Sequence, residues 1–97
     1  MRFLLPLSVT LLATPLAAQD LPFIGTWDCG VAIFSFTGTI YNNGSENMDI
    51  TDVAADGAGH VLTLGDGTQI SVTQTSDGGL TWVSAVSGES FTCARVN

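Results

Sequence analysis

Short runs in which apolar and polar residues alternate follow one another through most of the chain. In the run 69–75, Ile70 and Val72 share one face, and serine, threonine or glutamine occupies the positions between and beside them. Alternation of this kind is typical of a β-strand with one buried face. The same pattern predicts six further inward pairs, which are Trp27 and Cys29, Phe34 and Phe36, Met48 and Ile50, Leu62 and Leu64, Leu80 and Trp82, and Phe91 and Cys93.

Clusters of glycine, aspartate, asparagine and serine separate these runs. They lie at 42–45, 56–59, 65–67, 77–79 and 87–88, and these residue types tolerate the positive φ of tight turns. Since tight turns join neighbouring runs, we predict an all-β domain built as an antiparallel meander of six to eight strands. The count stays open because Gly30 and Gly38 each fit either a turn or a β-bulge within one longer strand.

The first residues have the order of parts of a secretory signal peptide. Arg2 supplies the positive charge, 3–13 is apolar, Pro15 breaks the stretch, and Ala17 and Ala18 are small residues suited to cleavage. The apolar stretch is shorter than the about 20 residues that span a bilayer. We therefore expect a signal peptide at 1–18, cleaved to within one or two residues of Ala18. A single exported domain at 19–97 would remain, periplasmic or extracellular, without stable membrane insertion.

The two cysteines lie on the first and last predicted strands. Cys29 and Cys93 both belong to the inward face of their strands, and disulfides persist in export compartments. We therefore predict a Cys29–Cys93 disulfide. The alternative, two free or metal-binding thiols, lacks a second Cys/His cluster. A meander whose first and last strands meet is a closed or nearly closed up-and-down barrel, which has no exposed strand edges.

The disulfide also predicts a neighbouring pair. In antiparallel strands the sum of paired residue numbers is constant, so a pair of 29 with 93 sets 27 opposite 95. Trp27 then lies beside Arg95, and a guanidinium over an indole face contributes about 0.5–2 kcal/mol. This register holds only if the strand number is even, because an odd number makes the end strands parallel.

Charge narrows the range of partners. After residue 18 the chain has no lysine and a single arginine, Arg95, against nine carboxylates, a net charge of −8. Such a surface repels nucleic acid and anionic lipid headgroups. A basic protein is the partner that this charge favours, although the acidity also fits a role in solubility alone.

No residue pattern of an active site is present. His60, the only histidine, is expected to be a solvent-facing turn residue, and no Gly-x-Ser-x-Gly nucleophile motif occurs. Asp49 and Asp52 are expected on opposite strand faces. Their carboxyl groups would then point away from each other, so they would not act together as a catalytic acid and base. We predict no catalytic residues and no cofactor.

The Asp-Gly turns raise the question of calcium. Asp66 and Asp77 precede glycines and offer the oxygen ligands that calcium prefers. Neither an EF-hand loop nor a nonapeptide calcium repeat is present. We therefore interpret both segments as hairpin turns and predict no metal site.

Two sets of residues resemble known exported barrels. Gly25, Trp27 and Arg95 resemble the calycin pattern, in which a Gly-x-Trp lies on the first barrel strand and, in lipocalins, a late arginine packs over the tryptophan. The segments 27–30 and 91–93 are similar to the inhibitors of c-type lysozyme, periplasmic or membrane-bound, which pair a cysteine of the first strand with one of the last. The layout also resembles uncharacterised exported bacterial proteins of this length.

The lysozyme-inhibitor resemblance implies an inhibitory function. Those inhibitors insert a Ser-Gly-containing motif that precedes an aromatic strand, and here 87–91, Ser-Gly-Glu-Ser-Phe, has this form later in the chain. Three hypotheses follow from the sequence. The first is an acidic exported binding domain whose partner is unknown. The second is an inhibitor of a basic secreted enzyme such as c-type lysozyme, and the third, with least support, is a hydrolytic enzyme.

Overall fold

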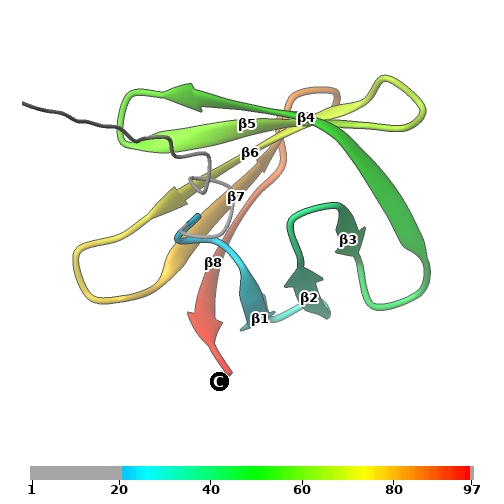
Figure 1. Ribbon diagram of the computed structural model, residues 1–97. Coiled ribbons are helices and arrows are strands. Elements are labelled where there is room, and N and C mark those ends of the chain that lie inside the picture. The colour runs from blue at the N-terminus through cyan, green and yellow to red at the C-terminus, as the bar shows by residue number, and fades with distance from the viewer. Residues whose placement is uncertain (1–20, 97) are drawn as a thin grey trace, which may run out of the picture.

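The computed structural model describes residues 21–96, so the signal peptide expected at 1–18 lies outside the described residues. Eight strands close into a barrel in sequence order, and all neighbours are antiparallel, including β1 and β8 (Figure 1). The strands are β1 (Gly25–Asp28), β2 (Ile33–Phe36), β3 (Ile40–Asn42), β4 (Asn47–Asp56), β5 (Gly59–Leu64), β6 (Gln69–Gln74), β7 (Leu80–Ser84) and β8 (Ser90–Arg95). The predicted all-β barrel is confirmed, and its eight strands are the highest number in the predicted range of six to eight.

Both ambiguous glycines mark turns, which accounts for the higher strand count. Gly30 lies in the β1–β2 turn with φ of +84°, a conformation that favours glycine. Gly38 lies between β2 and β3. Within residues 21–96 there is no helix of the length and hydropathy needed to cross a membrane.

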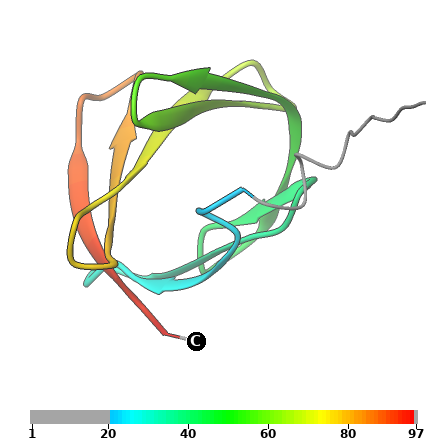
Figure 2. The same ribbon diagram turned by 60° about the vertical axis from the view of Figure 1, so that its left-hand side comes forward.

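Strand β4 contains a bulge that changes the direction of its side chains. Ile50 pairs with Leu64, but Asp52 pairs with Thr63, which leaves Thr51 as the extra residue. One extra residue shifts the alternation by one position, so Asp49 and Asp52 both lie on the exposed outer side. The prediction that they lie on opposite faces was wrong. The bulge also bends β4 between its pairing with β3 and its pairing with β5 (Figure 2).

The interior is filled by the predicted inward positions. Phe34, Ile70 and Leu80 are at most 5% exposed, while Met48 and Phe91 are half-buried near one end. The complete set of buried residues is Phe23, Trp27, Cys29, Phe34, Phe36, Tyr41, Ile50, Leu62, Leu64, Ile70, Val72, Leu80, Trp82 and Cys93. Rings supply much of this core, as expected for a small barrel filled by its own side chains.

One end of the barrel is covered by residues 21–24, which lie across the ring of strands in Figure 2. The Phe23 side chain is 1% exposed and its ring lies edge-on to Phe36, with centroids 5.6 Å apart. The Trp27 indole Nε1 donates a hydrogen bond to the Phe23 carbonyl at 2.9 Å. The chain segment before β1 thus seals this end of the core.

His60 belongs to the same sealed end. It is the second residue of β5, it is half-buried, and its ring centroid lies 5.4 Å from that of Phe23. The prediction of a solvent-facing turn residue was wrong, because His60 has the inward parity of Leu62 and Leu64 and Phe23 covers it.

Candidate functional site at the open end of the barrel

The two barrel ends differ in what closes them. Because the strands form an antiparallel meander, the β1–β2, β3–β4, β5–β6 and β7–β8 turns all lie at one end, which we call the mouth. The other end, the closed end, carries residues 21–24 and the β2–β3, β4–β5 and β6–β7 turns. The segment at 21–24 covers only the closed end.

A cavity of about 330 Å³ opens at the mouth. Its walls come from the inner faces of six strands, β2 to β7, and from the mouth turns. The lining residues are Val31, Ala32, Phe34, Tyr41, Asn43, Met48, Leu64, Thr68, Ile70, Trp82 and Ser84. Most of these side chains are apolar or aromatic, which is typical of small-ligand and side-chain pockets.

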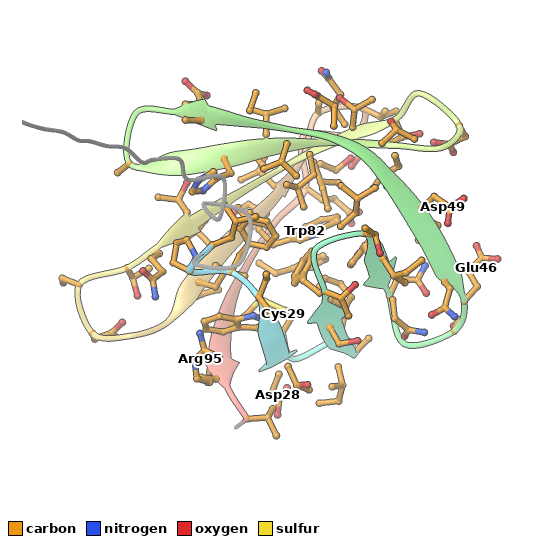
Figure 3. All side chains as sticks on the ribbon, in the orientation of Figure 1. Asp28, Cys29, Glu46, Asp49, Trp82 and Arg95 are labelled. Carbon is orange, nitrogen blue, oxygen red and sulfur yellow. A yellow bond between two sulfur atoms is a disulfide. The ribbon has the colours of Figure 1, made fainter. Side chains whose placement is uncertain are left out.

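Stacked rings give the cavity a fixed wall. Trp82 stacks on Phe91 with centroids 5.2 Å apart, and the Phe34 ring lies 5.3 Å from Trp82. Tyr41 meets Phe34 edge-on at 5.6 Å and stacks on Phe36 at 4.9 Å. Because each ring is held by others, the wall is formed before anything binds (Figure 3 shows Trp82 in the barrel interior).

The Trp82 indole N–H and the Tyr41 hydroxyl are the polar groups of the aromatic part of this wall. The Trp82 indole Nε1 is buried, and within residues 21–96 it makes no hydrogen bond of standard geometry. Burial raises the pKa of the Tyr41 hydroxyl to about 12, and the nearby Trp82 indole N–H opposes part of that increase. The indole nitrogen itself is buried within the wall and has almost no surface open to solvent.

Acidic residues surround the mouth. Glu46, Asp66 and Glu89 lie on three of its turns, and Asp28 ends β1 beside the fourth. Asp66 Oδ1 accepts a hydrogen bond from the Thr68 N–H at 2.9 Å, and the hydrogen bonds from Thr68 lower the pKa of the Asp66 carboxyl. Figure 3 places Glu46 on the outside of the β3–β4 hairpin. The mouth turns therefore present negative charge around an apolar centre.

The two pairs predicted from the sequence, Cys29 with Cys93 and Trp27 with Arg95, are not among the residues that line the cavity. Both pairs have structural roles. Cys29 and Cys93 form a disulfide with a Cα–Cα distance of 4.0 Å. Two positions along, Trp27 is opposite Arg95 in the β1–β8 register, and the guanidinium carbon lies 4.2 Å from the Trp27 ring centroid. A disulfide is typical of proteins that work outside the reducing cytosol.

Arg95 also holds the closed end. Its Nη1 donates to the Ile24 carbonyl at 3.3 Å and its Nη2 to the Pro22 carbonyl at 3.1 Å. These bonds join the last strand to the segment before the first strand. The sequence predicted the Trp27–Arg95 pair, but it gave no sign that the same arginine fixes residues 21–24 over the core.

The two Asp-Gly segments are hairpin turns, as predicted, and Gly67 and Gly78 each have φ of +88°. The Asp77 carboxylate accepts hydrogen bonds from the Thr75 hydroxyl and the Gly79 N–H, which lower its pKa. Within residues 21–96 no three His, Cys, Asp or Glu side chains are grouped to hold a metal ion.

Sequence reasoning did not identify the mouth. Tyr41 lies on a strand of only three residues, too short for alternation to be visible. Met48, Ile70 and Trp82 were predicted as inward residues. Ile70 and Trp82 are buried and Met48 is half-buried against them, but the unfilled space between them is a property of the closed barrel. Comparison of the chain with models of known protein families, with curated proteins and with solved structures found no match.

Proposed function

We propose that this protein is an exported binding domain that holds a basic protein partner at the mouth and has no catalytic role. The observation that carries the proposal is the combination of an apolar cavity with an acidic residue at each of the four mouth turns. Arg95 and His60 lie toward the closed end instead, against residues 22–24.

This arrangement suits a protein partner. Opposite charges across an interface steer the encounter and favour one register, while a desolvated apolar centre supplies most of the affinity. Because exposed charges are screened within about 8–10 Å at physiological salt, the association rate should fall as ionic strength rises.

Inhibition of a basic secreted enzyme, with c-type lysozyme as the example, is the second candidate. One observation favours it. The segment Ser87-Gly88-Glu89, part of the sequence that resembles the inhibitors' Ser-Gly motif, is exposed on a mouth turn and carries one of the mouth acids. An exposed turn at the mouth of the barrel suits insertion into an enzyme cleft.

The test is binding of purified 19–97 to basic secreted proteins, with c-type lysozyme first. A mouth variant, Glu46→Gln with Glu89→Gln, is compared with a matched variant on β4 away from the mouth, Asp52→Asn with Asp56→Asn. Both variants remove two exposed charges. We expect the mouth variant to weaken binding by about ten-fold and the matched variant to have little effect.

Equal weakening by the two variants would show that only net charge matters, and absence of binding to every basic protein tested would overturn the proposal. A lysozyme activity assay separates the candidates. Binding without inhibition at micromolar excess removes the inhibitor candidate and leaves the binding domain.

A further inference from the structure

We infer that the mouth cavity receives a single aromatic or large aliphatic side chain of a partner protein, flanked in the partner's sequence by lysine or arginine. This inference rests on the proposed function and specifies the chemistry of the partner segment. It assigns to Trp82, Tyr41 and Met48 a direct role in binding.

The size of the cavity fits one side chain. Pockets for drug-sized ligands occupy about 300–1,000 Å³, and the mouth cavity, at about 330 Å³, lies at the lower limit. Anionic lipid headgroups would meet the acidic residues of the mouth turns. A side chain anchored in a pocket near the centre of an interface is the common form of a binding hot spot.

The rim has the composition of an interface. Val31 and Val86 lie on two mouth turns and are 65% and 77% exposed. Val31 also lines the cavity, and Glu46, Asp66 and Glu89 lie on the mouth turns. An apolar centre within a polar or charged rim is the usual anatomy of a protein–protein interface.

The experiment uses the two tryptophans as separate reporters. In a ¹H–¹⁵N spectrum of labelled 19–97, the Trp82 indole reports the cavity and the Trp27 indole, bonded to Phe23, reports the closed end. Three capped tripeptides are titrated: Lys-Phe-Lys, Lys-Ala-Lys and Glu-Phe-Glu. We expect Lys-Phe-Lys alone to move the Trp82 indole signal in a saturable way, with the Trp27 signal unchanged.

Each other outcome has a distinct meaning. If Lys-Phe-Lys and Lys-Ala-Lys shift only mouth-turn amides to the same extent, the cavity inference is overturned and the proposed function stands. If Glu-Phe-Glu moves Trp82 as strongly as Lys-Phe-Lys, the preference for a basic partner is overturned. Phenethylamine that binds as tightly as Lys-Phe-Lys would make the occupant a small cation and overturn the protein-segment assignment.

A pair of substitutions in one hairpin provides the matched control. Val31 lines the cavity, whereas Ile33 is 46% exposed and is not part of its lining. Val31→Lys should weaken Lys-Phe-Lys binding by about ten-fold by placing a like charge at the cavity, and Ile33→Lys should change it by less than about two-fold. Equal effects of the two substitutions would contradict the assigned position of the bound side chain.

Discussion

Tyr41 is the residue in which burial has the clearest chemical consequence. Its side chain is 2% exposed, and burial raises the pKa of the hydroxyl from 10.0 to about 12. Because it is the only tyrosine of the chain, the absorbance of tyrosinate reports this one group. The residue therefore offers a direct measure of how closed the mouth wall is.

Titration of the native protein by ultraviolet absorbance should give a tyrosine midpoint near 12, and the unfolded protein a midpoint near 10. Between these values the unfolded chain loses its proton and the folded chain keeps it. The free energy of unfolding should therefore fall by about 1.4 kcal/mol per pH unit across that window. Tyr41→Phe should abolish this slope, and a native midpoint of 10 would contradict the assignment.

Gly59 is fixed by close packing of two strands. A Cβ atom at this position would overlap Thr73 and lie 2.7 Å from the Val72 carbonyl oxygen. Gly59→Ala should therefore lower the free energy of unfolding by about 1–3 kcal/mol, measured by urea denaturation. Gly38→Ala is the control, because nothing lies within 4 Å of its Cβ position. Equal stabilities of the two variants would refute the packing argument.

At the scale of elements, Arg95 joins the segment 21–24 to β8. Its guanidinium has both the Trp27 ring and the Pro22 and Ile24 carbonyls as partners. Lysine keeps the charge but lacks the planar fork that serves several acceptors at once. Arg95→Lys should therefore loosen the cover over the closed end while the barrel strands stay paired.

The expected cost of Arg95→Lys is about 1 kcal/mol. Its specific signature is faster hydrogen exchange of the Trp27 indole N–H, which is bonded to the Phe23 carbonyl, with unchanged exchange of the Trp82 indole. Similar acceleration at both indoles would indicate general destabilisation instead of a loosened cover.

Strands with clean alternation were predictable and irregular elements were not. The pairs Ile70 with Val72 and Leu80 with Trp82 identified β6 and β7, because apolar side chains there alternate regularly with polar ones and so must face the core. The bulge at Thr51 was not predictable, since the extra residue depends on how β5 pairs with β4. The cover at 21–24 was also missed, because its burial depends on Arg95, 71 residues away from Ile24.

At the scale of the whole molecule, the disulfide is the link that spans the most chain. Cys29 and Cys93 are separated by 64 residues, and in the chain-entropy model closure of a loop of this size contributes about 4 kcal/mol. That is comparable to the net stability of a small domain. The sequence predicted the bond from the inward parity of both cysteines and from the expected export. The mouth cavity was not predictable, because it depends on how all eight strands leave one end unfilled.

The double variant Cys29→Ala with Cys93→Ala should lose about 4 kcal/mol of unfolding free energy and show a much lower urea midpoint. Reduction of the unmodified protein should have the same effect, which controls for the substitutions themselves. An unchanged midpoint would show that the strand pairing closes the barrel without covalent help.

The position of this bond has a consequence for a chain that meets proteases. All seven hairpin turns lie between Cys29 and Cys93, so a cut in any of them opens the covalent ring without releasing a fragment. The two pieces stay attached, and the unbroken strand pairs can hold them in place. A nicked molecule should therefore migrate as one species on a non-reducing gel and separate into two after reduction.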